Sequence, residues 1–429
     1  MIAASRPRWA DIAGGVTTFV TMAYIVFVNP SILQDAGMPF GAVMMVTCLS
    51  AAAGSILMGA LARYPIALAP GMGLNTYFTY AVVKGMGVAW QTALGAVFLS
   101  GVLFFVLTVL GVRQWIVAAI PRELYAAVSA GVGLFIAFIG LRNAGVIVAS
   151  PATLVSLGSL AAPTAALALG GLLLIAALLA WNVRGAMLIG ILATAAVAAA
   201  TGAAQWQPAE FNVSGITATA GQLDVAGALS RGVFEIVLVL FFVDLFDNLG
   251  TLVAVAKKAV LVQGNDGEIP RLNRILLTDA TATMAGAVAG TSTVVSYIES
   301  AAGVAAGGRS GVTAIVTGLL FLAALFVAPL VGAIPGAATA PALIVVGSLM
   351  MPVVSKISWD DPVVSVPAFL TMLTIPLTFS IANGLALGFT AFALLSIARH
   401  GVRSVGWPAY AMTALLVFRF VYLSRNAGH

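Results

Sequence analysis

The sequence predicts an all-α polytopic membrane protein. Of its 429 residues, 61% are hydrophobic and 8% are charged, and the mean hydropathy is +1.10. Apolar runs of about 17–23 residues recur from end to end, and each is long enough to cross a bilayer core of roughly 30 Å as a helix. The runs are continuous rather than alternating, which excludes a transmembrane β-barrel. We therefore expect a multi-pass protein of the cell (inner) membrane, in contact with the lipid bilayer.

Fourteen transmembrane spans are expected. The first apolar run is too long for a signal peptide and lacks a small-residue cleavage site, so it belongs to the fold. Segment 363–379 is apolar but interrupted by Pro367 and Pro376, and we interpret it as a half-helix or an interfacial piece. The spans are expected at 12–34, 40–62, 67–83, 89–112, 121–141, 162–181, 184–201, 232–254, 268–289, 291–306, 310–331, 338–355, 381–399 and 406–423.

The basic residues predict the orientation of these spans. With a cytoplasmic N-terminus, fourteen of the 19 Lys and Arg residues fall on the cytoplasmic side, as the positive-inside rule requires. Both termini are then cytoplasmic, and the longest polar loop, 202–230, lies outside. The net charge of +5 is scattered among short loops, so nucleic acid is not an expected partner.

Cysteine and histidine are too scarce to carry chemistry. The one cysteine, Cys48, allows no intrachain disulfide. The two histidines, His400 and His429, lie at the C-terminal end. These positions argue against a histidine proton relay and against a His/Cys metal site.

An offset of 220 residues relates the first half of the chain to the second. Pro121 then falls on Pro341 and Tyr77 on Tyr297. Residue identity between the halves is low, and the order of elements supports the repeat better. Because each half holds seven spans, the second copy lies upside down in the membrane, which is a transporter architecture.

The two least regular spans occupy corresponding positions in the halves. Segments 65–80 and 287–308 each begin with a short extended piece that carries Pro or Gly and Thr, and each then becomes helical. Irregular backbone at membrane depth is tolerated only where protein or a water-filled cavity surrounds it. Such a pair of interrupted spans predicts a site for a polar substrate.

A polar face runs along the apolar segment 237–251. Asp244, Asp247, Asn248 and Thr251 are spaced i, i+3, i+4 and i+7, which places them on one helical face. An acid inside a membrane segment costs about 2.5–3.5 kcal/mol on insertion scales and is tolerated where it faces a polar pathway. A helix–helix hydrogen bond or a buried ion pair is the alternative, but four aligned polar side chains favour a functional face.

Three further polar residues lie within predicted spans. Glu299 has no Lys or Arg nearby in its span, can exchange a proton, and can accept hydrogen bonds from ring N–H groups. A bond to a neighbouring half-helix N-terminus is its alternative role. Asn75 offers both a donor and an acceptor, although it could equally cap the half-helix that follows. For Asp279, between two threonines, we favour a structural hydrogen bond.

Six stretches of the chain carry motifs of a known family. In order, they are GGVTTFVTMAYIVFVNPSIL, APGMGLNTYF, FFVDLFDNLGT, GTSTVVSYIESAAGVAAGGRSG, ATAPALIVVGSLMM and VPAFLTMLTIPLTFSIANG. They resemble the nucleobase–cation symporter 2 superfamily, in its branch of AzgA-like adenine/guanine/hypoxanthine permeases. The resemblance covers nearly the whole chain, and the signature QNxGxxxxT of the xanthine/uric acid branch is missing.

The resemblance implies fourteen spans in two inverted sevens, with short antiparallel strands in spans 3 and 10. It also implies a homodimer, a core domain of spans 1–4 and 8–11, and a gate domain of spans 5–7 and 12–14. In this chain the core corresponds to 1–112 and 232–331 and the gate to 113–201 and 332–429, with an outer loop at 202–231.

The resemblance also implies the roles of several residues. Acids in spans 8 and 10 hold the base in the family, and here these are Asp244 and Glu299. The histidine of the uracil transporters is replaced by Asn248, which cannot titrate, so carboxylates must handle the proton. The implied substrate-binding residues are Glu299, Asp244, Asn75, Gly73, Tyr297, Ile298 and an aromatic such as Phe241, Phe242 or Tyr77, and the proton-coupling residues are Asp244, Glu299 and Asp247.

Three functions compete. The first is import of a purine base with protons by an elevator-like movement, with no cofactor, no bound metal and no enzymatic activity. The second is transport of an anion such as sulfate or bicarbonate, as in the wider fold, but two carboxylates in the pocket argue against an anion. The third is an intramembrane aspartyl protease, which needs two aspartates from separate helices, whereas Asp244 and Asp247 share one.

Overall fold

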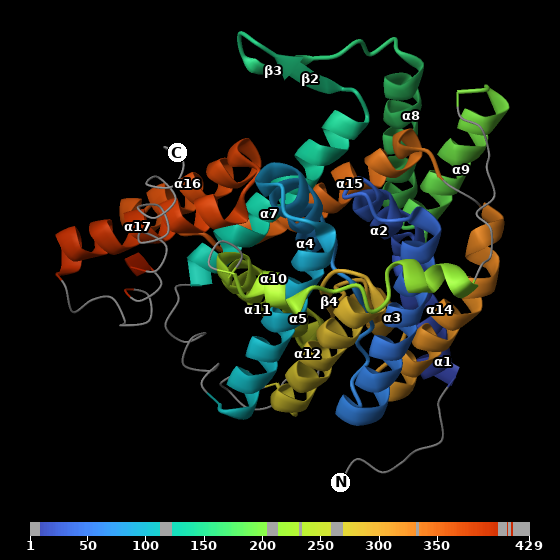
Figure 1. Ribbon diagram of the computed structural model, residues 1–429, viewed down its shortest axis with the longest axis horizontal. Helices are drawn as coiled ribbons and strands as arrows, with labels where there is room; N and C mark the ends of the chain where they lie inside the picture. The colour runs from blue at the N-terminus through green and yellow to red at the C-terminus, as the bar shows by residue number, and fades with distance from the viewer. Residues whose placement is uncertain are drawn as a thin grey trace. The chain divides into compact units, whose positions relative to one another are not determined.

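The computed structural model describes residues 9–111, 122–203, 213–230, 234–258, 269–331, 334–401, 410 and 413–414, and within them the chain is mostly helical, as predicted (Figure 1). Contacts divide the chain into two compact units. Unit 1 comprises Met1–Val109 and Gly140–Val345, and unit 2 comprises Leu110–Ile139 and Val346–His429. These units differ from the predicted core and gate domains, which were drawn from the order of the spans. The core and gate division stays a prediction.

Of the elements within the described residues, unit 1 holds most of the helices and all four strands. Its first half contains α1 (Trp9–Met22), α2 (Ile25–Gln34), α3 (Phe40–Leu57), η1 (Met58–Ala62), β1 (Leu68–Pro70), α4 (Met72–Thr76), η2 (Tyr77–Gly85) and α5 (Trp90–Val109). After β2 (Ile147–Ser150) and β3 (Leu154–Leu157) come α8 (Pro163–Ala180), α9 (Ala186–Ala200), η3 (Val213–Ala218), α10 (Val225–Ala228), α11 (Phe234–Lys258), α12 (Leu272–Ala289), β4 (Val294–Ser296), α13 (Ser300–Ala305) and α14 (Gly311–Val331).

Two helices cross the division between the units, and three elements belong to unit 2. The crossing helices are α7 (Arg122–Asn143) and α15 (Gly336–Met350), and unit 2 adds η4 (Met351–Lys356), α16 (Pro362–Thr378) and α17 (Ile381–His400).

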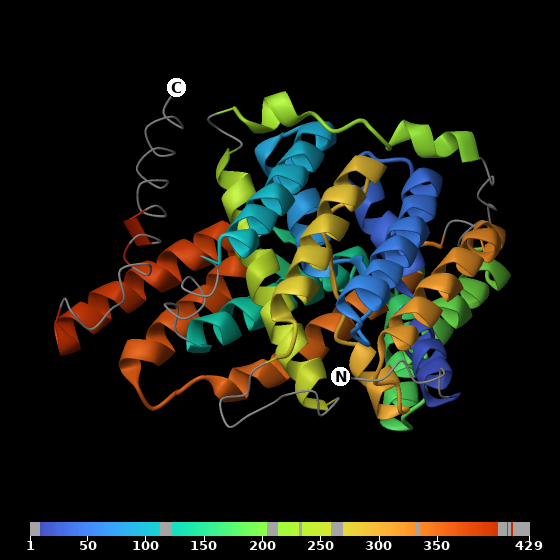
Figure 2. The ribbon, with the colours of Figure 1, turned by 90° about the horizontal axis from the view of Figure 1, so that it is seen from below.

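Five helices of unit 1 form a continuous row. In the order α5, α12, α3, α14 and α1, each helix packs against the next (Figure 2). Small residues allow the close approaches: a Cβ on Gly101 would lie 2.9 Å from the Met284 side chain, and one on Gly318 would lie 2.7 Å from the Ala52 carbonyl oxygen. Glycine lets helix backbones approach closely in apolar surroundings, so this row is held by tight packing.

Most predicted spans coincide with helices to within a few residues. Among the described residues, seven helices are long and apolar enough to cross a membrane, and shorter apolar helices follow the same pattern. The count of fourteen spans stays a prediction, because the last expected span, 406–423, lies almost wholly outside the described residues. The prolines do not interrupt segment 363–379: α16 is one continuous helix of 17 residues, with Pro367 and Pro376 inside it, and its interpretation as a half-helix or an interfacial piece stays a prediction. The Thr371 hydroxyl donates to the Pro367 carbonyl at 2.9 Å, within the helix itself.

The first expected span is one stretch, Trp9–Gln34, with a turn inside it. Helix α1 ends at Met22 and α2 begins at Ile25, with Ala23 and Tyr24 in the turn between them. Just before the turn, the Thr21 hydroxyl bonds back to the carbonyls of Thr17 and Thr18, both at 2.9 Å. Such back-bonding by threonine often bends helices, and no proline or glycine lies at the turn.

The expected strands in the two interrupted spans are present and pair with each other. Strands β1 and β4 are antiparallel, with Leu68 opposite Ser296 and Pro70 opposite Val294. The Ser55 hydroxyl accepts from the Leu68 N–H at 2.9 Å and donates to its carbonyl at 3.1 Å. Buried backbone groups need such partners, so this short ladder can exist inside the protein. The hairpin of β2 and β3 was not predicted.

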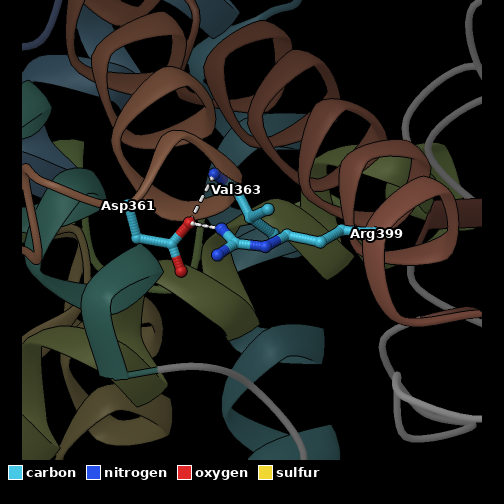
Figure 3. A network of polar contacts seen from close by, with 3 residues as sticks. All are labelled: Asp361, Val363 and Arg399. Carbon is cyan, nitrogen blue, oxygen red and sulfur yellow. Dashed lines mark hydrogen bonds and ion pairs between the residues drawn. The ribbon is translucent and has the colours of Figure 1, made fainter.

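In unit 2, α16 and α17 form a hairpin whose ends are tied by one side chain. Asp361 caps α16 by accepting from the Val363 N–H at 3.1 Å, and it pairs with the Arg399 guanidinium in the last turn of α17 at 2.6 Å (Figure 3). An acceptor at a helix N-terminus and a cation near a C-terminus both favour the helices they flank.

Candidate functional site

The paired strands bring the two interrupted spans together. Helix α4 follows β1 and carries Gly73 and Asn75, whereas Tyr297, Ile298 and Glu299 follow β4. Two backbone bonds extend the ladder: the Gly71 N–H donates to the Thr293 carbonyl at 2.9 Å and the Tyr297 N–H donates to the Ala67 carbonyl at 3.0 Å. Helix α11, with Asp244, packs against both β4 and α13. Residues far apart in the sequence therefore meet in unit 1.

Glu299 receives a hydrogen bond from a residue outside the expected site. The Tyr24 hydroxyl donates to Glu299 Oε1 at 2.7 Å, and Tyr24 itself is 1% exposed. Of the neighbours of Glu299, Tyr297 is buried and its hydroxyl donates to the Pro70 carbonyl, whereas Ile298 is 55% exposed. The segment thus presents an apolar side chain beside a partly exposed carboxylate.

Asp244 belongs to a buried network that contains a second aspartate. The Asn248 amide nitrogen donates to Asp244 Oδ1 at 2.7 Å and to Asp279 Oδ2 at 2.6 Å. The Asn248 amide oxygen accepts from the Ser296 N–H at 3.0 Å, and the Ser296 hydroxyl donates to Asp279 Oδ1 at 3.2 Å. All four residues are buried. One asparagine therefore links two carboxylates to strand β4.

Asn75 lies in a second buried network. Its amide nitrogen donates to Asn29 and its amide oxygen accepts from the Ser292 hydroxyl. The Asn29 amide in turn donates to the hydroxyls of Thr47 at 2.7 Å and Thr291 at 3.1 Å. No side-chain cap is made at the start of α4, so Asn75 joins spans rather than capping its helix.

The remaining predicted site residues have different surroundings. Phe241 is 2% exposed and packs edge-on against Phe104 and Phe242, with centroids 5.9 and 5.0 Å apart. Tyr77 is fully buried and Gly73 is partly exposed. The side chain of Asp247 lies outside the described residues.

Three contributors to these networks were not predicted as site residues. Tyr24 stands out in hindsight as a phenol inside the apolar run TMAYIVFV, and Asp279 as a carboxylate in mid-span. Asn29 carries the weakest signal, since an asparagine before a proline is common in turns. Their partners come from other spans, so sequence spacing could not reveal them.

The family of the chain follows from its comparison with known proteins. The model of a family described as "Permease family" matches residues 10–387. The chain belongs to this family, the nucleobase–cation symporter 2 permeases. The resemblance stated from the motifs is thereby confirmed, and the chain is a multi-pass membrane permease.

Relatives match this permease along almost its whole length. A putative permease of Methanocaldococcus jannaschii is 52% identical and covers 96% of this chain and 95% of its own. The guanine/hypoxanthine permease PbuG of Bacillus subtilis is 44% identical, covering 96% of each chain. The adenine permease AdeP of Escherichia coli is 41% identical, covering 97% of this chain and 93% of its own.

Solved structures resemble this permease in fold. The transmembrane domain of the cyanobacterial bicarbonate transporter BicA has a TM-score of 0.64 at 15% identity and covers 88% of this chain and 97% of its own. SLC26A9 has a TM-score of 0.65 at 10% identity and covers 91% of this chain and 65% of its own. At these identities the likeness confirms the predicted inverted-repeat fold and does not extend to substrate.

Proposed function

We propose that this permease is a secondary transporter that imports purine nucleobases such as adenine, guanine or hypoxanthine. One observation carries the proposal: carboxylates from two separate helical segments, Asp244 and Glu299, flank the same pair of short strands. The names of the relatives from Bacillus subtilis and Escherichia coli support the substrate class.

The arrangement suits the edge of a purine ring. Carboxylate oxygens accept from ring and exocyclic N–H groups, and backbone groups beside a strand end supply both donors and acceptors. In this proposal Glu299 and Asp244 bind the N–H groups, Tyr297 and Ile298 contribute backbone groups, and Gly73 leaves room for the ring. Asn75 acts through its network, and Phe241, Phe242 or Tyr77 supplies the apolar surroundings.

We infer that protons drive the import. Asp244, Glu299 and Asp247 are the carboxylates assigned to proton uptake and release, and the two histidines of the sequence lie near its C-terminal end, far along the chain from them. One proton moving down 100 mV supplies about 2.3 kcal/mol, which is worth roughly 50-fold accumulation.

We also infer an elevator-like movement in a homodimer of the inner membrane, with both termini cytoplasmic. In its support, the described residues of the site all belong to unit 1. A rigid-body movement of that unit would carry the site with it.

Uptake of radiolabelled adenine, guanine, hypoxanthine, xanthine and uracil into proteoliposomes tests the function. We expect saturable purine uptake that collapses with a protonophore and is indifferent to replacing Na⁺ by K⁺. Full purine uptake without a proton gradient, with Na⁺ retained, would disprove proton coupling. The anion alternative comes from the wider fold alone, and uptake of sulfate or bicarbonate in place of purines would establish it.

A further inference from the structure

Tyr24, in the turn within the first span, donates a hydrogen bond to Glu299, the carboxylate of the tenth span. Tyr24 is 1% exposed and lies in the turn between α1 and α2, and its hydroxyl donates to Glu299 Oε1 at 2.7 Å. This distance is that of a strong O–H···O bond, and a charged acceptor strengthens it further. The contact spans 275 positions of sequence, so it forms only in the folded site.

Glycines bring α1 close enough for the phenol to reach. A Cβ on Gly14 would lie 2.7 Å from the Gly308 Cα and 2.8 Å from the Gly303 carbonyl oxygen, and a Cβ on Gly303 would collide with the Thr18 hydroxyl. Helix α1 therefore lies against α13 backbone to backbone. Because α13 begins directly after Glu299, the same contact fixes Tyr24 relative to the carboxylate.

A carboxylate without such a partner would be free to rotate about its last side-chain torsion, which is broad. The Tyr24 hydroxyl occupies one oxygen and so fixes the plane of the carboxylate. The second oxygen can then meet a ring N–H without first being ordered by the substrate, and binding loses less side-chain entropy.

We propose that Tyr24 is a positioning residue of the purine site, which orients the Glu299 carboxylate for the substrate. The inference rests on the proposed function and extends it to a residue of the first span. Tyr24 acts through Glu299 and does not itself touch the purine.

The test is a double-mutant cycle on purified permease. The variants are Tyr24→Phe, Glu299→Gln and the double variant, and the readouts are purine Kd by calorimetry per folded protein and KM against Vmax for uptake. We expect Tyr24→Phe to raise Kd and KM about 10- to 100-fold, as for a lost bond to a charged group, with Vmax per folded protein unchanged. In the Glu299→Gln background the same change should alter Kd by less than about twofold, because residues that act through one group are not additive.

Tyr64→Phe is the matched control. Tyr64 is also buried, at 3% exposed, and its hydroxyl has no hydrogen-bond partner among the described residues. Removing that hydroxyl should leave Kd and KM unchanged. Equal effects of the two Tyr→Phe changes would reduce Tyr24 to a packing residue and overturn the inference, as would additive effects in the cycle.

The wild-type arm separates the two proposals. If wild-type permease binds none of the five bases, the proposed function fails and the inference fails with it. If the wild type binds a purine and Tyr24→Phe binds it equally well, only the inference fails.

Discussion

Asn248 connects the members of the acidic network through its side-chain amide. Its two amide hydrogens go to two different aspartates, and its oxygen accepts from the backbone of β4. The Asn248 amide donates a hydrogen bond to each of the carboxylates of Asp244 and Asp279, but it cannot itself accept or release a proton. The carboxylates themselves are left to do so.

Neutral substitutions should separate the roles of the two aspartates. An asparagine at Asp279 can accept from Asn248 through its oxygen and donate to Ser296 through its nitrogen, so Asp279→Asn preserves the network and should accumulate purine like the wild type. Asp244→Asn should still bind purine but lose proton-driven accumulation and the pH dependence of uptake. Asp279→Ala leaves buried partners unmatched and should cost about 1–3 kcal/mol of stability.

Binding by calorimetry, uptake across pH 5–8 and thermal unfolding give the three readouts. A loss of accumulation in Asp279→Asn, with binding intact, would move the proton site from Asp244 to Asp279.

At the residue scale, the sequence singled out the carboxylates inside the spans better than it indicated their hydrogen-bond partners. Asp244 and Glu299 were evident because a carboxylate is costly in an apolar span. The roles of Tyr24 and Asn29 were not evident, because placing a single uncharged tyrosine or asparagine in an apolar span costs much less free energy than placing a carboxylate there. For Asn75, the sequence is compatible with both a polar contact and a helix cap, and its side-chain partners are Asn29 and Ser292.

Among the elements, the short helix α10 is held in place by Asp224, a residue of the polar loop. Asp224 accepts from the Gly227 N–H at 2.8 Å and from the Thr92 hydroxyl at 3.0 Å, and its own N–H donates to the Gln91 carbonyl at 2.9 Å. It thereby caps α10 and ties the loop to the start of α5. The bonds from Gly227 and Thr92 hold the pKa of the carboxyl below its usual value of 3.8.

The loop anchor should therefore weaken in acid. A carboxyl whose pKa is lower in the folded than in the unfolded chain stabilises the fold above the unfolded pKa, and this stabilisation is lost as the pH falls through the folded pKa. Exchange protection of the Gly227 amide, measured in detergent, should thus be complete at pH 5–7 and decline below about pH 4. In Asp224→Asn, whose amide oxygen still caps but does not titrate, protection independent of pH is expected. The same acid-induced decline in both proteins would rule out Asp224 as its cause.

Element boundaries were predictable where the apolar pattern was continuous, as in α5, α8 and α17. They were not where side chains override the pattern. Threonine back-bonding precedes an irregular turn at Ala23 and Tyr24 in a span that the sequence predicts to be regular, whereas α16 stays helical through two prolines. Hairpin β2–β3 occupies residues 147–157, IVASPATLVSL, a stretch too short to cross a membrane and without regular strand alternation.

On the scale of the whole molecule, the inverted repeat was read from the order of elements and is confirmed by the fold of the solved relatives. The strand, short helix and long helix of one half, β1, α4 and α5, recur as β4, α13 and α14 in the other.

If unit 1 moves as a body, distances between the units should change while distances within it stay constant. After replacement of the buried Cys48, spin labels at Met86 and Ser355 report between units, and labels at Met86 and Val155 report within unit 1; all three positions are exposed. Electron–electron resonance should show the first distance shifting on addition of purine and a proton gradient, and the second unchanged. Equal changes in both pairs would contradict a rigid-body movement.

The ribosome releases residues 68–70 more than two hundred peptide bonds before residues 294–296, yet these are the two strands that pair. During synthesis, Ser55 can satisfy the Leu68 backbone, but the backbone groups of β1 that pair with β4 must wait for their partner, in surroundings where each unpaired group is costly. A chain that stops short of β4 therefore leaves these groups without their partners. The pairing that builds the site also makes the two halves of the permease interdependent during synthesis, since the first half cannot complete its backbone bonding until the second has been made.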